Sequence, residues 1–319
     1  MDHNVIDLVD ITKKYGSFTA VDHLNLTVKK SEVFGLLGPN GAGKSTTILM
    51  MLGLTEPTSG SVSVCGINST TNPIEVKRKV GYLPEDVGFY NDLSGIENLV
   101  YTARLNGLSR KEAEESAVIF MKKVGLSGDI NKKAGKYSRG MRQRLGLADV
   151  LIKKPEIIIL DEPTSGIDPT GVRDFLNLIV ELSRQDGITV LFSSHNLHQV
   201  QQVCDHLALF VHGKIIADGN VQNLSVKLFG NEPFIISAGI SLNGKNVNPE
   251  EELKKIEGVT TISREKNIFN IGCSKDVTPE IARVIVNSGM NLNYLHRKEY
   301  GLDEIYNRYF EGEGKHERK

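Results

Sequence analysis

The segment GPNGAGKST, residues 38–46, constrains this chain more than any other part of its sequence. It fits the pattern G-x-x-x-x-G-K-[ST] and follows the apolar run VFGLL, which predicts a buried strand. A glycine-rich turn could match this pattern by accident, but a preceding strand and a following helix are the context that a phosphate loop requires. We therefore expect a nucleotide site made by Gly38, Pro39, Asn40, Gly41, Ala42, Gly43, Lys44, Ser45 and Thr46.

The chemistry of this loop follows from its backbone and from two side chains. Glycines let successive backbone N–H groups point at phosphate oxygens, and the N-terminus of the helix adds partial positive charge. Lys44 is expected to reach the β- and γ-phosphates, and Ser45 to ligate Mg²⁺.

A second motif, IIILDEPTSGIDP, occupies residues 157–169. Its apolar strand would deliver Asp161 and Glu162 to the carboxyl edge of a parallel sheet, where open α/β sheets bind ligands. We predict that Asp161 holds Mg²⁺ and that Glu162 acts as general base or orients the attacking water. Outside this context, two solvated carboxylates at a helix start would be the simpler interpretation. His195 ends the next strand, TVLFSS, and is predicted to contact the γ-phosphate, although a lone histidine is more often structural.

Length and charge limit the other possibilities. A chain of 319 residues favours two domains, and a formal net charge of -1 provides no extended surface of one sign for nucleic acid or lipid. Three widely spaced cysteines (Cys65, Cys204 and Cys273) predict neither a disulfide framework nor a metal pair, which favours a reducing compartment. No apolar run approaches the ~18 residues that span a bilayer, and no secretory signal is expected.

The remaining patterns predict the organisation of the chain. Weak alternation around KKYGSF indicates an antiparallel hairpin, and the 3.6-residue apolar period between about residues 86 and 154 indicates a helical subdomain. A hairpin turning at His212 and Gly213 is followed by a linker. From residue 234 the order β-α-β-β-α-β is typical of a ferredoxin-like fold, with a further short helix expected at 302–310 and a frayed tail after it.

Taken in this order, the motifs resemble the ATP-binding subunits of ABC transporters over about residues 4–225. GPNGAGKST is similar to the Walker A loop, LDEP to the Walker B motif, SGIDP to the D-loop with Asp168, and SSH to the switch histidine. YSRGM, residues 137–141, resembles the signature motif that binds a neighbour's nucleotide through Ser138, Arg139 and Gly140. Tyr15 resembles the aromatic residue that stacks on adenine, with Val21 beside it, although an ordinary hairpin tyrosine would look the same.

Two positions differ from the commonest family pattern. Glu85 stands where a glutamine is usual, and Arg139 where a glycine is usual. Both variants resemble the branch of drug, sodium and polysaccharide exporters whose permease is a separate chain. Glu85 can still offer Mg²⁺ an oxygen, and Arg139 adds a cation that would help to neutralise the γ-phosphate.

The resemblance implies an α/β fold: a P-loop ABC ATPase domain at 1–225 with a mixed core sheet, an N-terminal antiparallel β subdomain and a helical subdomain, then an α+β ferredoxin-like domain at 230–319. It also implies a homodimer that closes head to tail on ATP and Mg²⁺, and a motor that drives export through an integral membrane permease at the cytoplasmic face of the cell membrane. The alternative is a soluble ABC-type ATPase acting on nucleic acid or ribosomes, although the charge favours no nucleic acid partner. The C-terminal unit could regulate the motor or serve only for packing.

Overall fold

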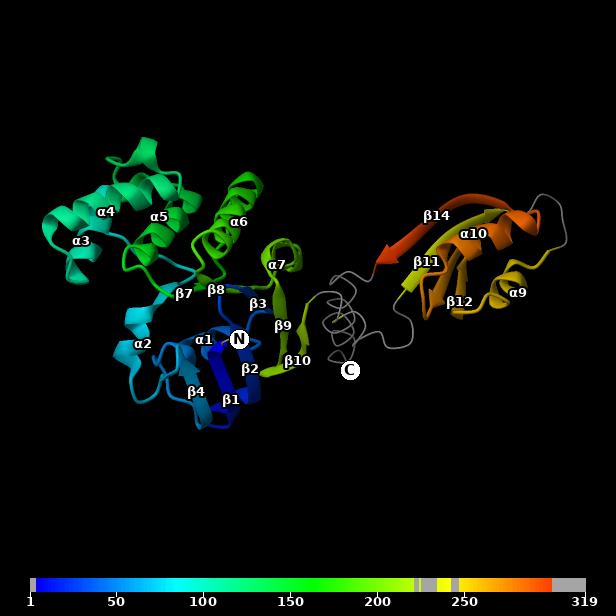
Figure 1. Ribbon diagram of the computed structural model, residues 1–319, viewed down its shortest axis with the longest axis horizontal. Helices are drawn as coiled ribbons and strands as arrows, with labels where there is room; N and C mark the ends of the chain where they lie inside the picture. Colours follow the sequence, from blue (N-terminus) through cyan, green and yellow to red (C-terminus); the bar gives the residue numbers. More distant parts are fainter. Residues whose placement is uncertain (1–3, 221–223, 225–233, 242–246, 300–319) are drawn as a thin grey trace. The chain divides into compact units, whose positions relative to one another are not determined.

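The computed structural model describes residues 4–220, 224, 234–241 and 247–299 (Figure 1). They belong to two compact units that divide between Asp218 and Gly219. The linker expected near residue 230, the helix expected at 302–310 and the tail after it lie outside the described residues.

A six-stranded sheet forms the centre of the first unit, in the order β10-β9-β3-β8-β7-β6. Strand β3 pairs in parallel with β8 and β9, and β7 pairs in parallel with β8 and β6. Every residue of β3, β7 and β8 is buried, as expected for parallel strands covered on both faces. The strands are β3 (Val33–Leu37), β6 (Val80–Leu83), β7 (Ile157–Asp161), β8 (Thr189–Ser194), β9 (His206–Val211) and β10 (Lys214–Gly219).

The predicted hairpin between β9 and β10 is confirmed. His212 and Gly213 form its turn, and both have positive φ, at 46° and 78°. Two successive residues of this kind give the tight turn that suits the twist of paired strands. The sheet is therefore mixed at this edge.

A second sheet of four strands, in the order β2-β1-β4-β5, packs over one face of the first through a shared core. Ile6, Leu8 and Leu24 of this sheet belong to the same buried cluster as Leu36 and Ile159 of the central strands. Helix α1 (Lys44–Met51) contributes Ile48, Met50 and Met51 to that cluster. The strands are β1 (Asn4–Tyr15), β2 (Phe18–Lys29), β4 (Ser59–Val64) and β5 (Ile67–Asn68).

The predicted helical region is also present. Figure 1 shows α3, α4 and α5 grouped together, on the opposite side of the central strands from β1, β2 and β4. Ser94 and Ser109 begin α3 and α4 with complete capping boxes, closed by Glu97 and Glu112. The helices are α2 (Pro73–Lys79), α3 (Gly95–Leu105), α4 (Arg110–Lys123), α5 (Arg139–Leu151), α6 (Pro169–Arg184) and α7 (Leu197–Val203).

The second unit has the predicted ferredoxin-like order. Its four strands form an antiparallel sheet in the order β12-β13-β11-β14. Leu253 of α9 and Ile281 and Ile285 of α10 pack on Ile236 and Ile271 of the sheet. The elements are β11 (Phe234–Ser241), α9 (Pro249–Lys254), β12 (Val259–Glu265), β13 (Ile268–Cys273), α10 (Thr278–Asn287) and β14 (Asn291–Glu299).

The central sheet can be tested by creating a cavity in it. Ile159 of β7 is fully buried, so Ile159→Ala should lower the free energy of unfolding by about 2–5 kcal/mol. Urea unfolding followed by circular dichroism measures this. The control is Ile74→Ala, at a position that is 66% exposed, which should change stability by less than about 0.5 kcal/mol. Equal losses from the two variants would contradict the assigned core.

Candidate functional site

The phosphate loop wraps around the N-terminus of α1. Gly41 and Gly43 have φ angles of 81° and 106°, a conformation that glycine adopts without strain. A Cβ atom at Gly43 would lie 2.5 Å from the carbonyl oxygen of Ala20 in β2. Glycine is therefore required here both for the turn and for the close approach of β2.

Lys44 is the first residue of α1, and its side chain is almost completely buried. Its Nζ donates hydrogen bonds to the carbonyl oxygens of Gly38 (2.6 Å) and Pro39 (3.1 Å) and lies 3.6 Å from Oε1 of Glu162. Burial lowers the pKa of Lys44, and the Glu162 carboxylate opposes that shift. The ammonium group thus lies between the phosphate loop and the predicted catalytic carboxylate.

A pocket of about 270 Å³ opens over this loop. Glu85 and Glu162 line it together with Phe18 and Ala20 of β2. Sequence reasoning missed Phe18 and Ala20, because nothing local marks a strand residue as lying beside a loop that follows another strand. The remaining lining residues are Asn40, Gly41, Ala42, Gly43, Lys44, Ser45 and Thr46.

The two residues expected to contact adenine lie in different surroundings. Tyr15 is half-exposed at the end of β1, and Nζ of Lys13 lies 5.0 Å from the centre of its ring. Val21 is fully buried in the shared core of the two sheets. An exposed aromatic face with a cation beside it can stack on a base, whereas Val21 acts by supporting the strand that carries Phe18 and Ala20.

The carboxyl ends of β7 and β8 bring Glu162 and His195 together. Nδ1 of His195 lies 2.9 Å from Oε2 of Glu162, and the backbone N–H of Glu162 donates to the carbonyl oxygen of Ser193. Glu162 has a positive φ of 47°, which is uncommon for a non-glycine residue. Burial raises the pKa of Glu162, so its carboxylate is a better proton acceptor than an exposed one.

Asp161 has the geometry that a cation site needs. Its side chain is buried at the end of β7, and Oδ1 has no hydrogen-bond partner in the described structure. A buried carboxylate oxygen without a partner is costly unless a donor or cation meets it. Among the described residues, no group of three or more histidine, cysteine, aspartate or glutamate side chains is placed to hold a metal ion, but Mg²⁺ on a nucleotide needs only one or two carboxylates with phosphates and water.

The predicted signature segment does not line this pocket. Ser138 is the N-cap of α5 and accepts a hydrogen bond from the backbone N–H of Met141. Arg139 is exposed, and Gly140 packs near Ile167. Asp168 is the N-cap of α6, where its carboxylate accepts from the backbone N–H of Gly171. Within one chain, therefore, Ser138, Arg139 and Gly140 stand apart from the nucleotide pocket.

Comparison with known proteins decides the family. The model of the family described as ABC transporter matches residues 21–165. The bacitracin transport ATP-binding protein BcrA of Bacillus licheniformis is 43% identical over 214 residues, which cover 67% of this chain and 69% of that protein. This chain belongs to the ATP-binding subunits of ABC transporters.

Two further comparisons extend this assignment. BcrA of Enterococcus faecalis is 33% identical over 310 residues, or 97% of each chain, so the similarity continues through the ferredoxin-like unit. A dimeric ATP-binding cassette, solved in a post-hydrolysis state with ADP and Pi, is 25% identical with a TM-score of 0.62. That match covers 67% of this chain and 98% of the other. This ABC subunit accordingly binds ATP and hydrolyses it.

Among its described residues, this ABC subunit has no helix that is both long enough and apolar enough to cross a bilayer.

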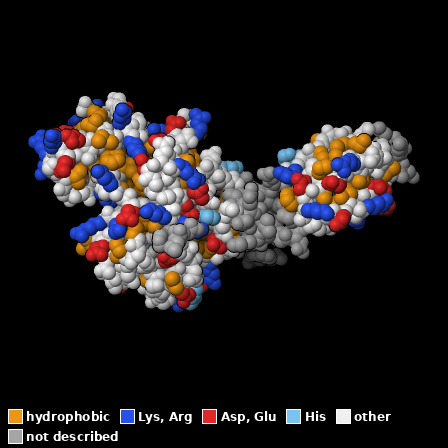
Figure 2. All heavy atoms as spheres, in the orientation of Figure 1, with side chains coloured by type: hydrophobic (Ala, Val, Ile, Leu, Met, Phe, Trp, Pro, Cys, Tyr) orange, Lys and Arg blue, Asp and Glu red, His pale blue; other side chains and the backbone are white. Residues whose placement is uncertain are grey.

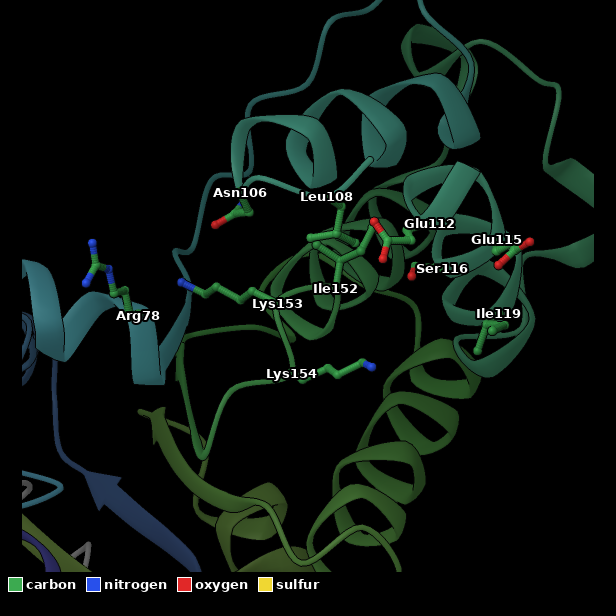
Figure 3. A pocket seen from close by; sticks show the side chains of 10 residues that line it. All are labelled: Arg78, Asn106, Leu108, Glu112, Glu115, Ser116, Ile119, Ile152, Lys153 and Lys154. Atoms are coloured by element: carbon green, nitrogen blue, oxygen red, sulfur yellow. The ribbon is translucent and has the colours of Figure 1, made fainter. Parts of the chain in front are cut away.

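A larger hollow of the ABC subunit, about 590 Å³, shares no lining residue with the nucleotide pocket. It lies beside α2, α4 and the end of α5, and Figure 3 shows its side chains. Arg78, Lys153 and Lys154 point in different directions there, and Glu112 and Glu115 lie on its other wall. Because its cations do not converge, this hollow is not a second phosphate site.

Two hydrogen bonds of glutamine side chains were not predicted from the sequence. The carbonyl oxygen of Gln199 in α7 accepts a hydrogen bond from Thr164, which holds the loop after Glu162 against the segment after His195. Gln143 of α5 donates from Nε2 to the backbone oxygen of Glu85 at 2.8 Å. Both residues lie in helices where a glutamine looks like any polar position, so no sequence signal marks them.

The role of Lys44 can be tested by truncation. Lys44→Ala should weaken ATP binding about tenfold or more, because charge-assisted hydrogen bonds to phosphate contribute about 1.5–3 kcal/mol. Binding of a fluorescent ATP analogue measures this. Lys111→Ala, which removes a lysine side chain that is 88% exposed, is the control and should bind as the wild type does. Tight binding by Lys44→Ala would refute the role of Lys44.

Proposed function

We propose that this subunit drives export through a separate membrane permease and that two copies pair head to tail, each closing the other's ATP site with its signature segment. The observation that carries this proposal is the position of Ser138. It begins α5 with its hydroxyl at the helix N-terminus, yet it does not line the pocket of its own chain. A helix N-terminus of this kind favours a bound anion, but the pocket of its own chain lies elsewhere. In a head-to-tail dimer it would instead bind the γ-phosphate held by the second copy.

The comparisons support the pairing and a role in transport. The solved cassette with ADP and Pi is dimeric, and the relatives from Bacillus licheniformis and Enterococcus faecalis are named for transport of bacitracin. Glu85 and Arg139 are the variants that resemble the exporter branch. Because the pairing is symmetric, one interface would contain two identical sites.

Each catalytic residue then has one task. Asp161 and Ser45 would hold Mg²⁺ on the ATP phosphates, and Glu85, which lines the nucleotide pocket together with Ser45, would contribute an oxygen. Lys44 neutralises the β- and γ-phosphates. Glu162 accepts a proton from the attacking water, and His195 orients Glu162 through their 2.9 Å contact. Hydrolysis would remove the γ-phosphate that joins the two copies.

The permease would dock on the helical region. Hydrophobic side chains are visible over α3 and α4 in Figure 2, and Tyr90, Tyr101 and Leu105 are 56%, 44% and 70% exposed. Tyr90 and Tyr101 meet edge to face, with ring centres 5.2 Å apart. Tyr101 and Val100 also line a groove of about 650 Å³ with a rim of charged residues. Exposed aromatic residues within a polar rim are typical of protein interfaces, and the partner would place the subunit at the cytoplasmic face of the membrane.

The head-to-tail scheme makes a direct prediction for Glu162→Gln. This variant should bind ATP, hydrolyse it at least about 100-fold more slowly, and elute as a dimer with ATP on a sizing column. The carboxamide keeps the shape of the side chain but accepts no proton, so the closed state accumulates.

The matched control adds Ser138→Arg to Glu162→Gln. A bulky cation at the N-cap of α5 should prevent the dimer while each chain still binds ATP in its own pocket. A Glu162→Gln chain that elutes as a monomer with ATP bound would contradict the scheme. So would loss of ATP binding in the double variant, because Ser138 would then belong to the pocket of its own chain.

The docking surface is tested by Tyr101→Ser. This change should reduce the fraction of the subunit retained on washed native membranes about fivefold or more, the effect of losing about 1 kcal/mol at an aromatic contact. Tyr294→Ser is the control, because that tyrosine is 41% exposed and lies in the ferredoxin-like unit. Equal retention of the two variants would exclude the surface around Tyr101.

A further inference from the structure

The two positions that depart from the usual family pattern, Glu85 and Arg139, line the same cleft. This cleft has a volume of about 270 Å³ and lies between the segment that follows β6 and the N-terminus of α5. Asp86, Arg142 and Gln143 are also in its wall. The cleft therefore carries carboxylates on one side and guanidinium groups on the other. Glu85 and Arg139 have opposite charges and lie on these two sides.

Arg139 connects three motifs within one chain. Its Nε donates a hydrogen bond to the backbone oxygen of Ser165 in the D-loop, and its Nη2 lies 3.6 Å from Oδ1 of Asp86. The side chain also passes over Gly166, which has a φ of 70°, and a Cβ atom there would lie 2.8 Å from Cδ of Arg139. The signature helix, the D-loop and the segment after Glu85 thus meet at one side chain.

A second tether joins the same two walls. Gln143 is 2% exposed and donates from Nε2 to the backbone oxygen of Glu85, while its Oε1 has no hydrogen-bond partner in the described structure. Glu85 itself lines both this cleft and the nucleotide pocket. Any movement of Glu85 toward Mg²⁺ or phosphate would therefore be transmitted to α5 through Gln143 and through Asp86 and Arg139.

We infer that Arg139 is a positioning residue that couples the chain's own nucleotide site to the signature segment it offers to its partner. This inference rests on the head-to-tail pairing proposed above. An exposed Arg–Asp pair by itself contributes under about 1 kcal/mol, and Asp86 is 94% exposed. The coupling therefore depends on two contacts made together: the planar guanidinium of Arg139 donates to the backbone oxygen of Ser165 and at the same time faces Asp86. A lysine ammonium at the end of a flexible stem does not reproduce this pair of contacts.

The coupling predicts non-additive effects on ATP hydrolysis by the full chain. Arg139→Met keeps most of the stem that covers Gly166 but removes the hydrogen bond and the charge, so it should lower the Hill coefficient for ATP toward one. Asp86→Asn should shift it in the same direction by less. Combining the two should add little to Arg139→Met, with a coupling factor of about two- to fivefold in kcat/KM. Arg139→Lys should give an intermediate Hill coefficient.

The matched control is Asp92→Asn, which removes another exposed carboxylate from the segment that follows Asp86 in the sequence. Alone it should leave hydrolysis unchanged, and with Arg139→Met its effect should be additive. Additive effects of Asp86→Asn and Arg139→Met, or an unchanged Hill coefficient in Arg139→Met, would overturn the inference. If Glu162→Gln still dimerises on ATP, such a result removes the role of Arg139 alone; if it does not, the pairing itself fails.

Discussion

The parallel alignment of β3, β7 and β8 is the constraint on which the rest of this structure depends. Parallel pairing places the carboxyl ends of these strands at one edge of the sheet, so the phosphate loop, Asp161 with Glu162, and His195 all emerge together. Parallel sheets normally have both faces covered, and here every residue of β3, β7 and β8 is buried. Burial in turn gives Lys44 and Glu162 their shifted pKa values, which an exposed loop would not produce.

The second constraint is the separation of the two helix N-termini that are expected to bind phosphate, those of α1 and α5. The phosphate loop begins α1 in the sheet-bearing part of the subunit, whereas Ser138 begins α5 in the helical part. Polar contacts of Arg139 and Gln143 connect these parts, beside the apolar packing of α5 against β6, where Val150 lies against Gly81.

The ferredoxin-like unit has its own core of residues from β11, β13, α9 and α10, as an independently folding domain does. The relative from Enterococcus faecalis matches this chain over 97% of its length, so a chain of this extent is not peculiar to this subunit. Whether this unit regulates the motor or serves for packing was left open by its sequence. Its antiparallel order agrees with the pattern of strands and helices, which is the part that local sequence encodes.

The sequence by itself determined the nucleotide chemistry, the order of the core elements and the ferredoxin-like pattern. Those features depend on short motifs and on apolar periods of 2 and 3.6 residues, which are local patterns in the amino-acid sequence. Only the tertiary structure placed Phe18 and Ala20 beside the phosphate loop, buried Val21 in the core, and set Arg139 against Ser165 and Asp86. These contacts join segments that are distant in sequence, and they follow from how two sheets and a helical region pack. Such packing leaves no local periodicity from which the partner of a side chain could be inferred.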